Sequence, residues 1–214
     1  FKKYSNEGSS IIYIGFSSAL SGCVNSARIA KEAVEDEIKS ADITVIDTKS
    51  ASLGLGLIVY YAANMLKNGA TKEEIINWIE ENKLKVNHWF TVDDLNHLKR
   101  GGRVSSTVAI VGTMLSIKPI MHVDDEGRLI PVSKVKGRKK SVKELQEKLK
   151  ERIVNPEYQT IFISHGDCLA EAEQLRDLIL NEVKVKEVII NNVGPVIGAH
   201  SGPGTLALFF IGNN

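Results

Sequence analysis

The sequence predicts an α/β fold whose first part is built on a parallel sheet, and three observations lead to this prediction. Residues 11–16 form an apolar, β-branched run with the length of a strand buried on both faces. The next segment places apolar side chains at helical spacing, namely Ala27, Ala30, Val34 and Ile38. Residues 42–47 then form a second short apolar run. Strand, helix and strand at this spacing make the βαβ unit of a parallel sheet.

A hydroxyl-rich turn joins the first strand to the first helix. Residues 17–22 read Ser-Ser-Ala-Leu-Ser-Gly, and the helical pattern begins near Ser21. Free backbone N–H groups and the positive end of the helix dipole converge at such a place, and the hydroxyls add further donors. The turn therefore predicts a site for a carboxylate or a phosphate. The alternative is that the serines only cap the helix, and the turn alone leaves both interpretations open.

The composition limits the classes of function. The 214 residues carry 27 basic and 26 acidic side chains, which gives a net charge of +1. This balance argues against a nucleic-acid-binding protein that relies on bulk charge, although residues 91–150 are locally basic. Cys23 and Cys168 make neither a disulfide framework nor a metal site, which favours a reducing cytoplasm.

No segment has the pattern of a signal peptide or a membrane span, so we expect no stable insertion into a membrane. The longest uncharged run, residues 50–66, is shorter than the roughly 20 residues that cross a bilayer. The chain starts with Phe1 rather than Met, and residues 1–6 have the pattern of a helix end that runs into a loop. We therefore expect the sequence to begin in the middle of a domain.

Residues 50–66 predict a helix that is apolar nearly all round and hence buried on most sides. Gly54 and Gly56 each cost a helix roughly 1 kcal/mol relative to Ala, so we expect a close backbone approach at these positions. Packing against another element is the favoured explanation, and a ligand tail that runs alongside the helix is the alternative.

A further helix and a strand are expected to complete the first domain. Thr71 and Glu74 form a capping box that starts the helix, and residues 86–92 alternate weakly, as in a strand. We place a domain boundary close to this strand because the composition turns basic and the alternation of strands and helices loosens. The predicted domains are residues 1–90 and 91–214.

The second domain is expected to contain a β-hairpin between helices. Residues 91–103 predict a short helix with Leu95 and Leu98 inward, and residues 108–117 predict an apolar helix that a Lys-Pro pair ends. Residues 120–132 predict the hairpin, because acidic residues and a glycine mark its loop.

The rest of the second domain returns to alternating helices and strands. A capping box of Ser141 and Glu144 is expected to start a helix. Strands are predicted over residues 160–167 and 186–193, with an amphipathic helix between them. The tail then begins as a glycine-rich loop that carries His200 and ends as a strand.

The known catalytic motifs are absent from the sequence. It contains no Gly-x-Ser-x-Gly, no His-Glu-x-x-His and no phosphate-binding Gly-x-x-x-x-Gly-Lys-Ser/Thr. His88, His97 and His122 are interpreted as surface or half-buried fillers. His165 and His200 each end an apolar run beside glycine, where ligand-facing residues gather. Ligand contact is favoured for His200 and disfavoured for His165.

Six stretches, taken together and in this order, resemble one family. They are Phe-Ser-Ser-Ala-Leu-Ser-Gly, Val-Ile-Asp-Thr-Lys-Ser-Ala-Ser-Leu-Gly, Val-Asp-Asp-Leu-Asn-His-Leu-Lys-Arg-Gly-Gly-Arg-Val-Ser, Ile-Lys-Pro-Ile-Met-His-Val-Asp, Ile-Ser-His-Gly-Asp and Gly-Pro-Val-Ile-Gly-Ala-His-Ser-Gly-Pro-Gly-Thr-Leu-Ala-Leu. The chain resembles the DegV-like fatty-acid-binding proteins of bacteria over essentially its whole length.

The resemblance implies a two-domain DegV-like fold with one long-chain fatty acid buried between the domains. It assigns the acid's carboxylate to Ser18, with Ser17 beside it, and to His200 of the glycine-rich loop. With the apolar helix as a wall, the expected tail or pocket residues are Leu53, Gly54, Leu57 and Ile117. The fatty acid is the expected ligand, and no catalytic residue, metal or other cofactor is expected.

The resemblance also implies a partner. The lipid-binding protein would present the carboxylate to a separate ATP-dependent kinase subunit in the cytoplasm, which makes acyl phosphate for phospholipid synthesis. The absence of a phosphate-binding loop fits a carrier that borrows a kinase. Basic residues that could dock this kinase or shield the phosphate are Arg100, Arg103, Lys136 and Arg138. A solvated basic face is the alternative interpretation of these residues.

Two departures from the family pattern affect these expectations. The family normally begins with a segment that holds a Thr-Asp-Ser strand end and a Thr-Thr-Ser-Gln-Pro loop, which adds a second hydroxyl ligand for the carboxylate. Neither motif occurs in this sequence. In addition, Lys136 stands where arginine is more usual, so a point charge replaces a planar fork of donors.

Two other functions compete with fatty-acid binding. One is an enzyme that acts on a small phosphorylated metabolite at the helix mouth beside Ser17 and Ser18. The other is an interaction module without a ligand. The first predicts turnover without a partner protein, and the second predicts that Ser18→Ala has no measurable effect.

Overall fold

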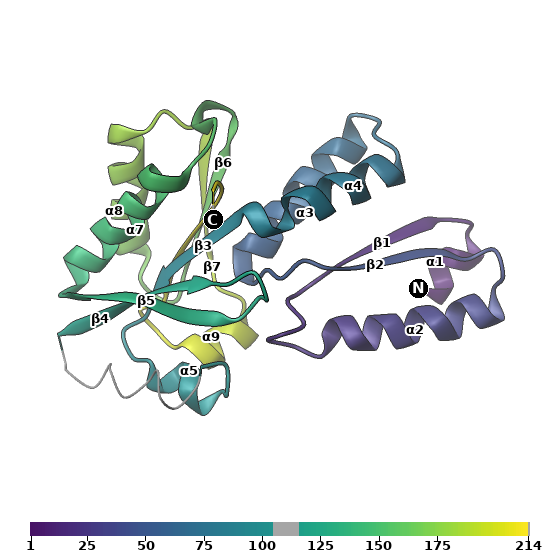
Figure 1. Ribbon diagram of the computed structural model, residues 1–214, viewed down its shortest axis with the longest axis horizontal. Helices are drawn as coiled ribbons and strands as arrows, with labels where there is room; N and C mark the ends of the chain where they lie inside the picture. Colours follow the sequence, from purple (N-terminus) through teal and green to yellow (C-terminus); the bar gives the residue numbers. More distant parts are fainter. Residues whose placement is uncertain (105–115, 214) are drawn as a thin grey trace.

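The computed structural model describes residues 1–104 and 116–213, and it confirms the α/β class (Figure 1). The described chain holds a two-stranded parallel sheet and a six-stranded mixed sheet. The six-stranded sheet has the strand order β5-β4-β3-β8-β6-β7. In Figure 1 the two-stranded sheet and its helix extend to one side of the larger sheet.

The predicted βαβ unit is confirmed. Strands β1 (Ser10–Gly15) and β2 (Asp42–Asp47) pair in parallel along their whole length, and α2 (Cys23–Glu37) connects them. The short α1 (Lys2–Asn6) precedes β1. The turn between β1 and α2 therefore lies at the carboxyl end of a parallel strand, beside the carboxyl end of β2.

Two helices, α3 (Ser52–Lys67) and α4 (Lys72–Asn82), follow β2. The capping box of α4 is confirmed, because the Glu74 amide donates to the Thr71 hydroxyl while the Glu74 carboxylate accepts from the Thr71 amide. Helix α3 is less enclosed than its composition predicts. It buries one face, but Val59 and Leu66 on the other are 43% and 66% exposed.

The six-stranded sheet forms the larger part of the structure. Its strands are β3 (Val86–Thr91), β4 (Ile117–Val123), β5 (Leu129–Lys136), β6 (Thr160–His165), β7 (Glu187–Asn192) and β8 (Leu206–Ile211). Its helices are α5 (Asn96–Arg100), α7 (Arg138–Arg152), α8 (Leu169–Glu182) and α9 (Pro195–Ser201), with 3-10 turns η1 (Lys83–Lys85) and η3 (Pro156–Tyr158). Strands β4 and β5 form the predicted hairpin, and β6 and β7 pair in parallel.

The six-stranded sheet has a core on each face. The side chains of successive residues in a strand point to opposite faces, so Phe90 and Phe209 join the core under α3 and α4. Trp89 and Phe210 join the core under α7 and α8. Burying both faces explains why all six residues of β3 are buried.

Three predictions of secondary structure need correction or restriction. Residues 108–115 of the predicted apolar helix lie outside the described residues, and Ile117 begins strand β4 instead of ending that helix. Helix α7 starts at Arg138 after Gly137, which has φ of 90°. The predicted capping box at Ser141 is therefore wrong, and this serine sits inside the helix, where its hydroxyl donates to the Arg138 carbonyl.

The glycine-rich tail is also more ordered than its composition indicates. Helix α9 occupies Pro195–Ser201, because a proline at the first helical position is already set to helical φ and loses no hydrogen bond there. His200 therefore lies on a short helix and not in a loop.

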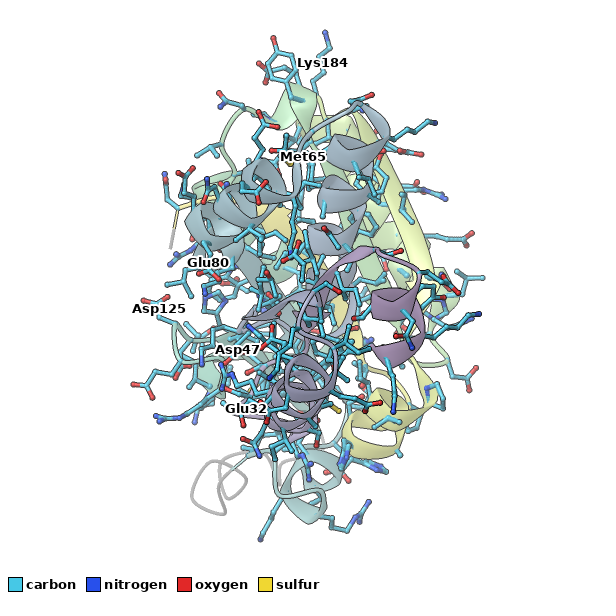
Figure 2. The ribbon with its side chains drawn as sticks, turned by 90° about the vertical axis from the view of Figure 1, so that its right-hand side faces the viewer. Glu32, Asp47, Met65, Glu80, Asp125 and Lys184 are labelled. Carbon is cyan, nitrogen blue, oxygen red and sulfur yellow. The ribbon has the colours of Figure 1, made fainter. Side chains whose placement is uncertain are left out.

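The division into domains at residue 90 stays a prediction; strand β3 itself pairs with β4 and β8. Among the described residues, no helix combines the length and the apolar character needed to cross a membrane. Figure 2 shows Glu80, Asp125 and Lys184 at the outside of the molecule, whereas Asp47 is a buried carboxylate.

The two glycines of α3 give a test of close packing, because a Cβ at Gly54 would overlap the ring of buried His88. At Gly56 a Cβ would meet only the flexible end of Leu53. We expect Gly54→Ala to lower the free energy of unfolding in urea, in spite of the better helix propensity of alanine. The matched control Gly56→Ala should leave stability unchanged or raise it by up to about 1 kcal/mol. Equal effects of the two substitutions would contradict the packing seen at His88.

Candidate functional site

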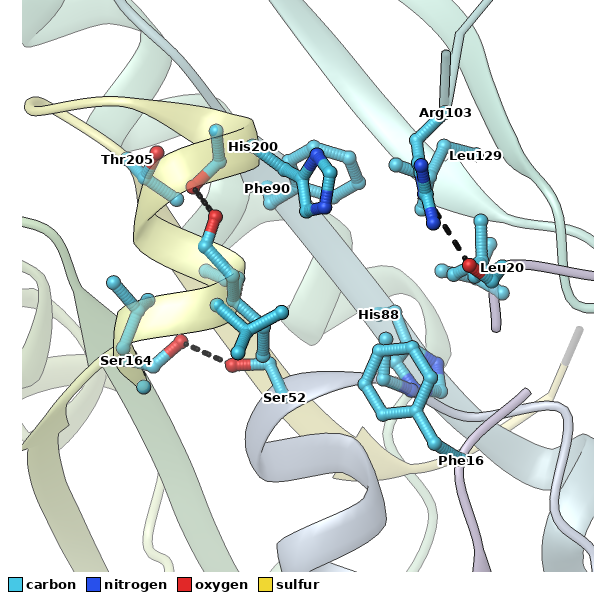
Figure 3. A pocket seen from close by; sticks show the side chains of 18 of the residues that line it. Phe16, Leu20, Ser52, His88, Phe90, Arg103, Leu129, Ser164, His200 and Thr205 are labelled. Atoms are coloured by element: carbon cyan, nitrogen blue, oxygen red, sulfur yellow. Dashed lines mark hydrogen bonds between the residues drawn. The ribbon is translucent and has the colours of Figure 1, made fainter. Parts of the chain in front are cut away.

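A cavity of about 400 Å³ lies where the β1–α2 turn, the β4–β5 hairpin, α5 and α9 meet the six-stranded sheet. Most of its lining is apolar. Large apolar side chains around it include Phe16, Leu20, Phe90, Leu98, Leu129 and Phe209. Figure 3 shows Phe16, Leu20, Phe90 and Leu129, which come from segments far apart in the sequence. A concave, mostly apolar space of this size is typical of a site for a small apolar ligand.

Two basic side chains, Arg103 and His200, lie on one side of this cavity (Figure 3). Both pack against Gly101: the Arg103 guanidinium donates to its carbonyl, and a Cβ at Gly101 would overlap the His200 ring. Arg103 also donates to the Leu20 carbonyl at 3.3 Å. Among the described residues, no carboxylate forms an ion pair with Arg103. This side of the cavity can therefore bind an anion.

A second polar point of the cavity lining is formed by Ser52 and Ser164. Their hydroxyls are 3.0 Å apart, so one of them donates a hydrogen bond to the other. Ser52 has φ of 51°, a conformation that costs a residue with a β-carbon on the order of 1 kcal/mol. No local sequence pattern indicates this pair, because the two serines are 112 residues apart and come together through the packing of α3 on β6.

His88 also lines the cavity, and it is neutral. Complete burial lowers the pKa of His88 to about 3, and the nearby His122 contributes in the same direction. The hydrogen bond of its Nδ1 to the Val86 carbonyl requires a proton on Nδ1, so Nε2 accepts the Ala51 amide. The prediction that His88 lies at the surface or is half-buried is therefore wrong, because His88 is buried and lines the cavity.

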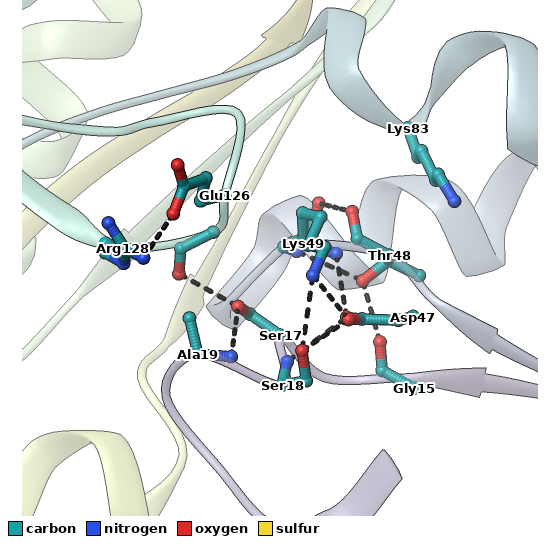
Figure 4. A network of polar contacts seen from close by, with 12 residues as sticks. Gly15, Ser17, Ser18, Ala19, Asp47, Thr48, Lys49, Lys83, Glu126 and Arg128 are labelled. Atoms are coloured by element: carbon teal, nitrogen blue, oxygen red, sulfur yellow. Dashed lines mark hydrogen bonds and ion pairs between the residues drawn. The ribbon is translucent and has the colours of Figure 1, made fainter. Parts of the chain in front are cut away.

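The serine turn is organised around a carboxylate of the protein itself (Figure 4). The Ser18 amide donates to Asp47 at 3.1 Å and the Ser18 hydroxyl donates to the same carboxylate at 2.5 Å. Lys49 pairs with Asp47 at 2.7 Å and donates to the Ser18 hydroxyl. The sequence leaves a bound carboxylate or phosphate and a simple helix cap as alternatives for this turn, and in the structure the Ser18 donors bind the carboxylate of Asp47.

Ser17 has a structural contact of its own. Its hydroxyl is fully buried and donates to the Gly127 carbonyl at 2.8 Å, which joins the turn to the β4–β5 hairpin. Neither Ser17 nor Ser18 is among the residues that line the cavity, whereas Phe16, Leu20 and Ser21 of the same turn are. The assignment of a ligand carboxylate to Ser17 and Ser18 stays a prediction.

The four expected pocket residues do not line the cavity. Leu53, Gly54 and Leu57 lie on α3, where Gly54 packs behind the His88 ring and Leu57 is fully buried in the core. Ile117 begins β4. The part of this helix that does reach the cavity is its start, at Ala51 and Ser52.

The basic residues expected at a docking surface divide into two groups. Arg100 and Lys136 are exposed, and Arg100 contacts His97 on the same helix. Arg138 is only 17% exposed and its guanidinium pairs with Glu171 at 3.2 Å. Arg103 was assigned to docking from the sequence, but the structure brings it to the cavity beside His200.

The described residues contain no group of three or more His, Cys, Asp or Glu side chains placed to hold a metal ion. Burial raises the pKa of the Cys168 thiol to about 11, in spite of the nearby Arg138. The thiol is therefore protonated at neutral pH, and it donates to the Thr205 carbonyl.

A family model described as "Uncharacterised protein, DegV family" matches residues 1–213. A DegV domain-containing protein of Clostridium perfringens is 54% identical over 213 residues, which cover 100% of this chain and 73% of that protein. A DegV domain-containing protein of Lactococcus lactis is 38% identical over 211 residues, covering 99% and 73%.

Solved structures show the same fold. A DegV lipid-binding protein from Thermotoga maritima superposes with a TM-score of 0.82 at 33% identity, covering 98% of this chain and 72% of that one. A fatty-acid-binding DegV family protein from Streptococcus agalactiae superposes with a TM-score of 0.84 at 32% identity, covering 99% of this chain and 74% of that one. A DegV family protein from Thermus thermophilus, described by its fatty-acid binding, superposes with a TM-score of 0.88 at 28% identity, covering 99% of this chain and 74% of that one.

The Asp47 cluster gives a prediction for pH dependence. Burial alone would raise the pKa of Asp47, but the hydrogen bonds from Lys49 and Ser18 outweigh it and lower the pKa to about 2. In the unfolded chain the pKa is about 3.9. The stabilisation is therefore complete above about pH 5 and is lost as the pH falls from about 4 towards 2.

We expect Asp47→Asn to lower the urea midpoint at pH 7 and to bring the variant closer to the wild type at pH 3. Asp36→Asn is the control, because Asp36 is exposed and its ion pair with Lys39 contributes little. A difference between wild type and Asp47→Asn that is as large at pH 3 as at pH 7 would exclude this role of the carboxylate.

Proposed function

The chain belongs to the DegV family, and we propose that it binds one long-chain fatty acid in the cavity, with the acyl chain against the apolar wall. The observation that carries the proposal is the combination of an apolar cavity with two basic side chains, Arg103 and His200, on one side. A fatty acid has the matching shape, since a single carboxylate ends a long apolar chain. Each buried methylene contributes roughly 0.8 kcal/mol before the cost of ordering the ligand.

We propose that the carboxylate binds to Arg103 and His200. The Arg103 guanidinium already donates to two backbone carbonyls in the cavity wall, so its charge is held in place without neutralisation by a carboxylate of the described chain. A charge-assisted hydrogen bond to the ligand would contribute about 1–2 kcal/mol. For His200, the sequence pattern favours contact with a ligand, and its position in the cavity lining supports the same role.

The proposed role of Ser18, with Ser17 beside it, requires a rearrangement of the turn. Both donors of Ser18 point at Asp47, so a ligand carboxylate could bind there only after the Ser18 hydroxyl leaves that partner. Ser17 would have to give up its buried bond to the hairpin. Variants of these serines therefore test the turn separately from Arg103 and His200.

We further propose that the protein is a carrier in the cytoplasm and not itself an enzyme. In this role it would present the bound carboxylate to an ATP-dependent kinase subunit, which forms the acyl phosphate for phospholipid synthesis. Arg100 and Lys136 are proposed to dock this subunit, because both are exposed and free of carboxylate partners among the described residues. Arg138 is less suited to docking, since Glu171 already engages it.

The competing function, an enzyme for a small phosphorylated metabolite at the serine turn, has no support in the geometry. A phosphate bound at the Ser18 hydroxyl would lie next to the Asp47 carboxylate, and the two negative charges would repel each other. No observation on the described residues favours this reaction, and we do not propose it.

Mass spectrometry of the lipid extracted from the purified, denatured protein tests the proposal directly. We expect one fatty acid per chain, because such a ligand should remain bound during purification. The measurement should include the protein as expressed with any segment that precedes residue 1. A preparation that is folded, carries no fatty acid and takes up none from solution would refute the proposed function.

Head-group recognition can be separated from tail binding by comparing palmitic acid with its methyl ester. We expect Arg103→Met and His200→Ala each to weaken binding of the acid about 5- to 30-fold, which corresponds to about 1–2 kcal/mol. Binding of the ester should change less than twofold. The control is Arg100→Met, because Arg100 is an exposed residue of α5 that does not line the cavity. This substitution should leave the affinities for acid and ester unchanged. Equal losses for acid and ester would contradict the role in carboxylate binding.

Filling the cavity tests the position of the acyl chain. Ala207 lines the cavity from β8, so the ring of Ala207→Phe would occupy space that we assign to the chain. We expect at least a tenfold loss of palmitate affinity, with a smaller loss for a medium-chain acid. Ala63→Phe is the control, because Ala63 is an exposed residue of α3 outside the cavity. The assignment fails if Ala207→Phe binds palmitate like the wild type.

A further inference from the structure

We propose that Asp93 is a positioning residue that holds α5 against the glycine-rich segment at 202–204, and so sets the geometry between Arg103 and His200. The inference rests on the proposed function, because it concerns how the same site is held together. Asp93 lies in the loop between β3 and α5 and is not among the residues that line the cavity.

Lys118 of β4 holds this loop at two points. Its ammonium group pairs with the Asp93 carboxylate at 2.7 Å and also donates to the Asp93 backbone carbonyl at 3.4 Å. The Lys118 side chain is only 14% exposed, whereas the Asp93 side chain is 50% exposed, so this ion pair is shielded from water on the lysine side only. Such a partly shielded pair is worth more than a pair in which both partners are fully exposed.

Arg138, at the start of α7, is a second cation beside the same carboxylate. Its Nη1 atom lies 3.7 Å from Asp93, within ion-pair distance, while its Nε donates to Glu171 of α8 at 3.2 Å. Asp93 therefore lies between two cations that come from different elements. If Asp93 lost its negative charge, Lys118 would lose its ion-pair partner, and Arg138 would keep only Glu171 among the described residues.

The Asp93 segment is interlocked with the segment that carries His200. A Cβ at Gly204 would overlap the Asp93 carboxylate, and a Cβ at Gly202 would overlap the His97 ring. Both glycines have positive φ, 79° at Gly202 and 75° at Gly204, which a residue with a β-carbon rarely adopts. The backbone of Gly202 and Gly204 therefore lies directly against the His97 and Asp93 side chains, where a residue with a β-carbon would not fit.

The interlocking continues to the binding residues themselves. His200, two residues before Gly202, packs against Gly101 at the end of α5, and Arg103 donates to the Gly101 carbonyl. A shift of α5 away from α9 would thus separate the two basic side chains from each other. The carboxylate of Asp93 acts through this helix and does not touch the ligand.

The test compares Asp93→Asn with the wild type in binding palmitic acid and its methyl ester. We expect the preference for the acid over the ester to fall at least tenfold, while ester affinity changes less than twofold. Asp94→Asn is the matched control, because it removes the same charge one residue away, and its side-chain oxygen can still accept the Asn96 amide as Asp94 does. It should keep the wild-type preference.

Two further measurements test the same arrangement. Lys118→Met should lower the acid preference like Asp93→Asn, and it replaces Asp93→Asn if that variant does not fold. In the His200→Ala background, Asp93→Asn should cause little additional loss, because the two substitutions act on one arrangement. An unchanged acid preference in the folded variants, or equal weakening of acid and ester, would overturn the inference. A wild-type protein that binds neither ligand would instead refute the proposed function.

Discussion

The hydrogen bond from the Ser17 hydroxyl to the Gly127 carbonyl joins the two parts of the molecule that enclose the cavity. On one side of this bond lies the β1–α2 turn, and on the other the tip of the β4–β5 hairpin. Gly127 has φ of 81°, and a Cβ there would overlap the Ser17 hydroxyl, so the contact depends on glycine. Because the donor is fully buried, breaking the bond without a replacement leaves two polar groups unsatisfied. The wall formed by Phe16 and Leu20 is held over the sheet in this way.

The distribution of charge around the cavity follows from which cations already have partners. Lys49 is paired with Asp47 at the serine turn, and Lys118 and Arg138 share Asp93. Arg103 is bound to backbone carbonyls, which hold its position but leave its charge uncompensated by any carboxylate of the described residues. The cavity thus has a basic side near His200 and an apolar wall elsewhere, which is the division of polarity in a fatty acid.

Much of the fold could be predicted from the sequence, because its elements carry local signals. The apolar runs at β1 and β2, the Thr71–Glu74 capping box and the acidic hairpin loop each depend on neighbouring residues only. The helix start at Arg138 differs from the predicted start at Ser141, because the capping-box pattern is local whereas the chain turns into the helix at Gly137, directly after β5. The candidate site was predicted less well. His200 was found through its glycine-rich surroundings, but Ser52, Ser164 and His88 have no local signal that marks them as cavity residues.

The sequence by itself determined the class of fold and the family, and it left open whether the turn between β1 and α2 binds an anion or only caps the helix. The reason is that the periodicity of strands and helices, the positions of glycines and the order of motifs are all visible in the linear sequence, without knowledge of contacts between distant residues. Only the tertiary structure decided that the turn binds the Asp47 carboxylate, and that the Arg103 guanidinium lies at the cavity without a carboxylate partner among the described residues. Asp47 and Ser18 are 29 residues apart in sequence, yet they meet at the ends of adjacent parallel strands. His200 packs on Gly101, whose carbonyl accepts from Arg103, and this approach of His200 joins two segments that no local pattern connects.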